Sequence, residues 1–298
     1  MEFLVLEQTP KLFPSYRAAV LRRPNGASLP SRELRLPNVT VDVAHLAQYN
    51  RVCGFRLRDE LPATYPHVLA FPMALSLMTA ADFPFPALGI VHVANEIQVL
   101  RPLRSSDAFS LSVRAEALRP HERGRQFDVV ATASIADSPV WIGRSTYLRR
   151  DSDSTRAVGS TRAVGSAQSS INKSDIFDLP RATAVWRVPR RTGTDYARAS
   201  GDRNPIHTSR LLARAFGFKS TIAHGMWTKA RCLAALEGRL PAKFAVSVQF
   251  KLPILLPATV EFAANGGQIA VHDRRTGKPH LTGTIVDHDC ADPDEGAR

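Results

Sequence analysis

The feature that most constrains the fold of this chain is a layout of elements that occurs twice. An apolar stretch of helical character is followed by a segment of alternating polar and apolar residues, first at 71–81 and 89–103 and again at 225–236 and 244–257. Alternation with a period of two is typical of half-buried strands, whereas apolar residues three and four apart are typical of a helix. The repeated pattern predicts an internally duplicated α+β protein, with a sheet curled around a long helix in each half.

Each half contains further segments that fit this layout. The additional predicted strands lie at 107–118, 126–136, 140–149, 259–264, 268–273 and 280–287, and short helices are predicted at 43–51 and 193–200. We expect Pro72 to be the first residue of the first apolar helix, because proline is favoured at that position. Gly238 and Pro241 are expected to end the second apolar helix.

A polar segment separates the two halves. Residues 151–172 are small, polar and glycine-containing, and the hexamer Thr-Arg-Ala-Val-Gly-Ser occurs twice within them. Such a segment has too little apolar surface to offset the entropy lost on ordering. We therefore predict an N-terminal domain at 1–150, a flexible linker at 151–172 and a C-terminal domain at 173–298.

The composition excludes several classes of protein. The formal net charge is +12, but the basic residues are spread along the chain without interleaved aromatic residues, so no nucleic-acid partner is expected. No apolar run reaches about 18 residues, and the N-terminal segment does not resemble a secretory signal, so we expect no membrane span. Three widely spaced cysteines, Cys53, Cys232 and Cys290, fit reduced thiols in the cytoplasm.

The segment "SGDRNPIH" at 200–207 carries the strongest chemical signal. Asp202 and His207 would lie on different faces of a regular helix. Gly201 and Pro205 interrupt helical structure, so a turn can bring the two side chains to one point. An acid and an imidazole within reach of one water molecule form a general acid–base pair.

The segment "AHGM" at 223–226 follows 16 residues after this motif. Gly225 opens the second apolar helix, where free backbone N–H groups point outward. Such N–H groups can polarise a carbonyl, and glycine allows a close approach. The two motifs together predict proton chemistry next to a carbonyl group.

These motifs resemble those of the MaoC-like, (R)-specific enoyl-CoA hydratase family, also called hydratase 2. The resemblance rests on Tyr196, on Ser200 to His207, on Ala213 and on "AHGM". It implies a double hot-dog fold, in which two antiparallel sheets are each wrapped around a long central helix. It also implies a (3R)-hydroxyacyl-thioester dehydratase that needs neither a metal nor a redox cofactor.

The resemblance also implies roles for individual residues. Asp202 and His207 would be the catalytic pair, Asn204 would support them, and the N–H of Gly225 would hold the thioester carbonyl. The predicted substrate-binding residues are Ser200, His224 and Met226. Tyr196 is expected to pack beneath the loop.

The first half departs from the pattern. "LAFPM" at 69–73 stands where "IAHGM" stands at 222–226, and no Gly-Asp-x-Asn-Pro-x-His segment precedes it. We therefore expect this half to be catalytically silent and to accommodate the acyl chain. Ala70, Ala74 and Ser76 are candidates for the wall of an acyl tunnel.

Other readings of the sequence remain open. Asp202, His207 and His224 have side chains of the kind that bind zinc, although the resemblance does not require a metal. Two other functions are a hot-dog acyl-thioesterase and a non-catalytic acyl-thioester-binding subunit of a hydratase complex. The expected small-molecule partner is an acyl thioester of coenzyme A or of acyl carrier protein, and a second copy of the chain, forming a homodimer, is a further candidate partner. The phosphate of such a carrier could meet one of three basic residues near the motif, which are Arg203, Arg210 and Lys219.

Overall fold

The computed structural model describes residues 2–21, 26–87, 89–150 and 181–288. The predicted linker at 151–172 and Cys290 lie outside the described residues. The first half contains α1 (Leu12–Leu21), α2 (Val43–Cys53), α3 (Tyr65–Met78), β1 (Glu2–Val5), β2 (Arg32–Val39), β3 (Ile90–Val99), β4 (Phe109–His121), β5 (Gly124–Ile135) and β6 (Ser138–Arg150). The second half contains α6 (Thr192–Ser200), α7 (Pro205–Thr208), α8 (Arg210–Ala215), α9 (Gly225–Ala235), β7 (Ala182–Val188), β8 (Phe244–Phe250), β9 (Ala258–Asn265), β10 (Gln268–Asp273) and β11 (Pro279–Asp287).

Every strand and helix predicted from the sequence has a counterpart in the structure. Three strands, β1, β2 and β7, and three helices, α1, α7 and α8, were not predicted. Of the thiols, Cys53 and Cys232 are buried and form no disulfide.

The predicted start of the first apolar helix was wrong. Helix α3 begins at Tyr65, with Pro66 in its first turn, and Pro72 lies inside the helix. Pro66 takes the position in which proline's missing N–H costs nothing. Pro72 removes one backbone hydrogen bond from the helix interior. Nine of the 14 residues of α3 are buried, and this packing holds the helix together despite Pro72.

The strands form one sheet with the order β1-β2-β4-β5-β6-β3-β8-β11-β10-β9-β7. If β1 is set aside, the order of the first half reappears in the second, with β2, β4, β5, β6 and β3 matched by β7, β9, β10, β11 and β8. The two predicted antiparallel sheets are thus joined edge to edge through β3 and β8. This matching order is the signature of a duplicated unit related by a pseudo-twofold axis.

The β3–β8 pair is the seam between the halves. Glu96 is paired with Ser247 near its centre, and the register runs from Ala94–Gln249 to Val99–Phe244. Lys229 of α9 is fully buried against this seam, and its Nζ donates to the Asn95 backbone oxygen at 3.1 Å and to the Val246 backbone oxygen at 3.0 Å. A third bond runs to Asn95 Oδ1 at 2.6 Å. One lysine of the second half therefore ties together the edge strands of both halves.

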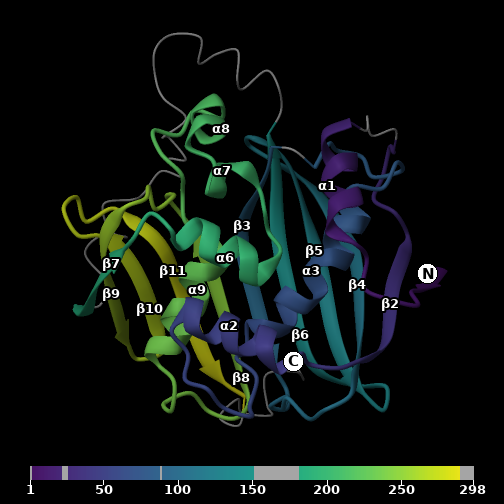
Figure 1. Cartoon of the computed structure of the whole chain (residues 1–298), viewed down its shortest axis with the longest axis horizontal. Coiled ribbons are helices and arrows are strands. Elements are labelled where there is room, and N and C mark those ends of the chain that lie inside the picture. Colours follow the sequence, from purple (N-terminus) through teal and green to yellow (C-terminus); the bar gives the residue numbers. More distant parts are fainter. Residues whose placement is uncertain (1, 22–25, 88, 151–180, 289–298) are drawn as a thin grey trace, which may run out of the picture.

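The sheet curves around the helices, and α3 and α9 lie against its inner face (Figure 1). Alternate residues of β4 and of β8 are buried, which gives each strand one apolar face. The inward residues of both halves belong to one continuous hydrophobic core. Burial of each large apolar side chain contributes about 1.5–3 kcal/mol, so the shared core favours a fixed arrangement of the two halves.

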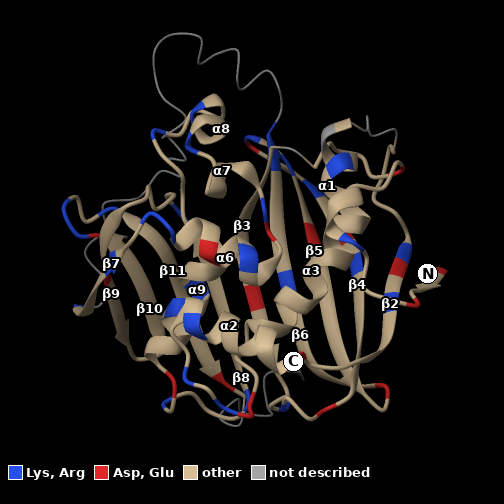
Figure 2. Ribbon diagram, viewed as in Figure 1, with Lys and Arg blue, Asp and Glu red and all other residues tan. Residues whose placement is uncertain are grey.

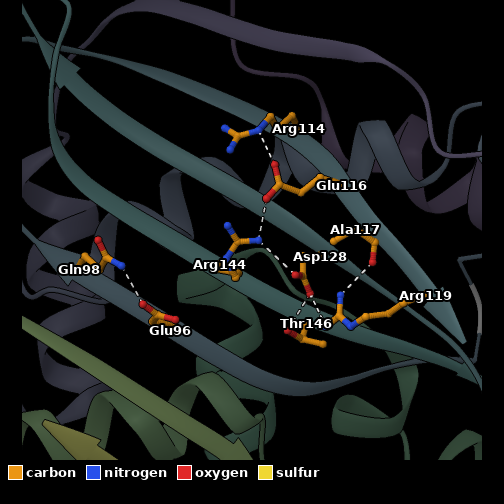
Figure 3. A network of polar contacts seen from close by, with 9 residues as sticks. All are labelled: Glu96, Gln98, Arg114, Glu116, Ala117, Arg119, Asp128, Arg144 and Thr146. Atoms are coloured by element: carbon orange, nitrogen blue, oxygen red, sulfur yellow. Dashed lines mark hydrogen bonds and ion pairs between the residues drawn. The ribbon is translucent and has the colours of Figure 1, made fainter. Parts of the chain in front are cut away.

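The outer face of the first half carries paired charges. Asp128 of β5 accepts hydrogen bonds from Arg119, Arg144 and Thr146, and Arg144 also donates to Glu116 (Figure 3). Elsewhere, basic residues occur over both halves and do not form a single stripe (Figure 2). The positive net charge is therefore distributed, as the sequence predicted. Among the described helices, none has the length and apolar character needed to cross a bilayer.

Candidate active site

The loop at 200–207 is built from a helix end followed closely by a helix start. Gly201 ends α6 with a φ of 76°, a left-handed conformation that favours glycine, and its N–H donates to the Ala197 oxygen. Asn204 caps α7 by accepting a hydrogen bond from the Ile206 N–H, and Pro205 is the first residue of that helix. The chain reverses between these two caps and leaves Asp202 in the turn.

This turn brings three side chains together. The ligand atoms of Asp202, His207 and His224 all lie within 4.8 Å of one another. The rings of His207 and His224 stack with centroids 3.6 Å apart, and His224 Nε2 lies 3.8 Å from Asp202 Oδ2. His207 and His224 are buried, whereas the Asp202 side chain is 31% exposed. The carboxyl group therefore lies where a substrate or water can reach it.

Hydrogen bonds fix which ring nitrogens carry hydrogen. His207 Nδ1 lies 2.8 Å from the Ile222 oxygen, and His224 Nε2 lies 2.9 Å from the Asp202 backbone oxygen. A carbonyl oxygen only accepts, so each of these nitrogens donates. His207 Nε2 and His224 Nδ1 therefore keep their lone pairs when the rings are neutral.

The surroundings favour the neutral form of both histidines. Burial lowers the pKa of His207 below its usual value of 6.5, and the opposing effects of Asp202 and of the Ile222 hydrogen bond are smaller. Burial lowers the pKa of His224 further, with an added contribution from the charge of His207. Near pH 7 His207 thus retains a free lone pair that can accept a proton.

The three side chains are of types that zinc binds. The rings of His207 and His224 are stacked at an interplanar angle of 23°. The hydrogen bonds to Ile222 and to Asp202 each occupy one nitrogen of a ring. The other nitrogen of His207, Nε2, can accept a hydrogen bond from a water molecule.

Helix α9 begins beside this cluster. Its N-cap, His224, makes no side-chain capping bond, so the first N–H groups of the helix depend on other acceptors. A Cβ added to Gly225 would lie 2.8 Å from Phe250 Cδ1, so the aromatic ring covers the glycine closely. The matching place in the first half, around Pro72, lies inside α3 and offers no helix start.

The first half lines the neighbouring surface. The ring of His92 on β3 stacks on Tyr147 of β6 at 4.7 Å and meets the Phe250 ring edge-on at 5.0 Å. The ring of His67 on α3 stacks on His92 at 6.1 Å. Through Phe250, this aromatic group reaches Gly225, so the candidate site lies between the two halves.

The other residues predicted for the site lie close by. The Ser200 hydroxyl donates to the Tyr196 oxygen and accepts from the Asp202 N–H. Its hydrogen is therefore already engaged within α6 and the turn. Met226 is buried in the core, and Tyr196 packs beneath the loop with its ring 4.9 Å from that of His224. Substrate contacts by Ser200, His224 and Met226 stay predictions. The three basic residues proposed for phosphate, Arg203, Arg210 and Lys219, are exposed.

Two contacts from the first half to this loop were not predicted. The Tyr16 hydroxyl of α1 bonds to backbone groups on both sides of Asp202. His45 Nε2 of α2 donates to the Ala199 oxygen at 2.8 Å, and the Tyr65 hydroxyl lies 2.8 Å from His45 Nδ1. No local pattern could reveal contacts between residues more than 150 positions apart.

The fold and the Asp–His turn define a double hot-dog protein of the hydratase type, and the chain belongs to the MaoC-like dehydratase family. A family profile described as "MaoC like domain" matches residues 171–284. The 3-hydroxyacyl-thioester dehydratase X of Mycobacterium tuberculosis is 37% identical over 266 residues, covering 88% of this chain and 91% of that protein. The crystal structure of HtdX from that organism matches 85% of this chain and 99% of that chain, with a TM-score of 0.72 and 35% identity.

A shorter relative matches part of the chain. The 3-hydroxybutyryl-CoA dehydratase of Methylorubrum extorquens is 34% identical over 84 residues, which cover 27% of this chain and 54% of that protein. A MaoC-like dehydratase from Phytophthora capsici has a TM-score of 0.67 at 18% identity and covers 89% of this chain and 98% of that one, which supports the fold alone. These matches confirm the family and the hot-dog fold predicted from the sequence.

Proposed function

We propose that this protein catalyses the reversible addition of water to trans-2-enoyl thioesters, giving (3R)-hydroxyacyl thioesters. The observation that carries the proposal is the meeting of Asp202, His207 and His224 beside the first residue of α9. The names of the relatives from M. tuberculosis and M. extorquens support a hydroxyacyl-thioester substrate. The (3R) configuration rests on the motif resemblance.

The N-terminus of α9 supplies the electrophilic part of the mechanism. The N–H of Gly225 donates to the thioester oxygen, which draws electrons from the conjugated double bond and leaves Cβ electron-poor. The absence of a side chain at Gly225 leaves room for the Phe250 ring, which lies where a Cβ would stand.

The acid–base pair binds and activates the water molecule. Asp202 and the free lone pair of His207 each accept a hydrogen bond from the water molecule. The water oxygen bonds to Cβ and keeps one hydrogen as the new hydroxyl, while its other hydrogen is passed by the pair to Cα. Reversal of these steps gives dehydration, and atoms and charge balance in both directions.

The roles of the remaining groups follow from their contacts. Asn204 shapes the turn by capping α7 and by donating its N–H to Asp202 Oδ1 at 3.2 Å, which orients the carboxylate. Coenzyme A and acyl carrier protein both remain candidate thioester carriers. Cytoplasmic location and association of two chains stay predictions.

The test follows the loss of enoyl absorbance when the purified protein meets trans-2-enoyl-CoA of short and long chain, with chiral analysis of the product. Asp202→Asn and His207→Ala are each expected to lower turnover by at least about 10²-fold. Asp195→Asn is the matched control, because Asp195 lies on α6 and pairs with surface arginines. It should retain wild-type turnover.

The outcomes separate the candidate functions. Near-wild-type rates in both site variants would refute the assigned pair. Release of free thiol from a saturated acyl-CoA would indicate the thioesterase. Tight acyl-CoA binding without turnover on either carrier would indicate the binding subunit.

A further inference from the structure

Helix α1 of the first half contacts the turn that holds Asp202. The Tyr16 hydroxyl donates to the Gly201 oxygen at 2.8 Å and accepts a hydrogen bond from the Arg203 N–H at 2.6 Å. Gly201 and Arg203 are the residues on either side of Asp202. A single hydroxyl group therefore bridges the backbone across the acidic residue.

The turn needs such a partner because it lies between two helices. Gly201 ends α6 and Pro205 begins α7, so the intervening peptide groups belong to neither helix. The other polar groups of the turn have partners nearby: the Asp202 N–H donates to Ser200 Oγ, and the Asp202 oxygen accepts from His224. The Gly201 oxygen and the Arg203 N–H find their partner in Tyr16, about 185 residues away in the sequence.

Leu12 strengthens the same contact. It lies four residues before Tyr16, so both side chains project from one face of α1. A Cβ on Gly201 would come within 2.7 Å of Leu12 Cδ1, which places the leucine directly over the glycine. By contrast, Phe13 on another face of α1 is 79% exposed. The face of α1 that carries Leu12 and Tyr16 is thus fitted to the turn.

The surroundings keep the Tyr16 hydroxyl protonated. Burial raises its pKa far above the usual value of 10, and the nearby Asp202 raises it further. Near neutral pH the hydroxyl therefore stays protonated and donates to the Gly201 oxygen.

We propose that Tyr16 is a positioning residue: its hydroxyl holds the Gly201–Arg203 backbone so that Asp202 faces His207 and His224. The catalytic consequence rests on the function proposed above. Without the bridge, the turn loses two hydrogen bonds, and a displacement of about 1 Å at the reacting groups costs about 10²-fold in rate. The silent half would in this way support the chemistry of the other half.

The test compares three variants of the full chain. Tyr16→Phe keeps the ring and removes only the bridging hydroxyl. Leu12→Ala weakens the packing over Gly201 and leaves the hydroxyl in place. Phe13→Ala changes an exposed side chain of the same helix and is the matched control.

We expect kcat to fall while KM stays nearly unchanged. Tyr16→Phe should lower kcat about 10- to 100-fold, with KM for enoyl-CoA within about threefold of wild type. Leu12→Ala should lower kcat less, and Phe13→Ala should leave it unchanged. Hydrogen exchange of the Arg203 amide should accelerate in Tyr16→Phe while the melting temperature stays within a few degrees. A wild-type kcat in Tyr16→Phe, or a loss confined to KM and melting temperature, would overturn the proposal.

Hydrogen exchange separates this proposal from the proposed function. If the wild-type protein hydrates no enoyl thioester, the proposed function fails, and exchange of the Arg203 amide still tests the bridge. Unchanged exchange in Tyr16→Phe would then show that the hydroxyl does not hold the turn, whatever reaction the site performs.

Discussion

A single added methyl group at Gly225 should reduce turnover while leaving the protein folded. The Cβ of Gly225→Ala would lie 2.8, 2.9 and 3.0 Å from three atoms of the Phe250 ring. Carbon atoms in ordinary contact are about 3.5–4.0 Å apart, so the ring or the first turn of α9 must move by about 0.7 Å. His92 packs against the ring of Phe250, which limits how far that ring can move.

The expected magnitude follows from that displacement. A misplacement of about 1 Å costs about 10²-fold, so a shift of about 0.7 Å should lower kcat by about 10- to 100-fold. Stability should fall by about 1–3 kcal/mol, because the methyl group overpacks a site that the Phe250 ring already fills. A variant that stays folded at the assay temperature but turns over slowly would therefore identify a positional effect at the helix start.

The assay is steady-state hydration of trans-2-enoyl-CoA, with thermal unfolding measured in parallel. Phe250→Leu is measured alone and combined with Gly225→Ala, because a smaller side chain leaves room for the new methyl group. The double variant should be faster than Gly225→Ala, which gives a favourable coupling between the two sites. A kcat of Gly225→Ala within twofold of wild type would refute the reasoning, as would a double variant no faster than the single one.

Two further predictions concern stability. Asp128→Ala should lower the free energy of unfolding by about 1–3 kcal/mol, because the buried carboxylate accepts bonds from Arg119, Arg144 and Thr146; an unchanged urea midpoint would contradict this. Stability should also fall between pH 6.5 and 4, because burial lowers the pKa of His67 to about 4 and only the unfolded chain binds its proton in that range. The loss from His67 is up to about 3 kcal/mol, reduced where water reaches the ring, and urea titrations at pH 7 and pH 4 that gave equal midpoints would exclude it.

An element could be predicted where residues close together in the sequence specify it. Strands β3 to β6 and β9 to β11 were placed within a few residues, whereas the segment predicted at 244–257 extends seven residues beyond the end of β8 at Phe250. The unpredicted β1 and β7 are the outermost strands of the sheet within the described part of the chain, and polar residues are tolerated at such positions. The start of α3 was misplaced because two prolines, Pro66 and Pro72, compete for the role of first residue.

Part of the candidate site is likewise specified by residues close together in the sequence, and part of it depends on tertiary contacts. The turn at 200–207 is specified by neighbours in sequence, since Gly201 ends one helix and Asn204 with Pro205 starts the next. Its proximity to His224 and Gly225 followed from the second motif. The support from Tyr16 could not be predicted, because it depends on a tertiary contact spanning 185 residues.

The buried lysine at the seam has a consequence for how such a chain can evolve. In a dimer of identical subunits every residue occurs twice, so a lysine beside the twofold axis would place two lysine side chains on the same pair of carbonyls. In this chain Ser76 stands where the alignment of 69–73 with 222–226 would place the counterpart of Lys229. Fusion of the two halves into one polypeptide therefore permits a single buried lysine at the centre of the molecule, an arrangement that exact symmetry forbids.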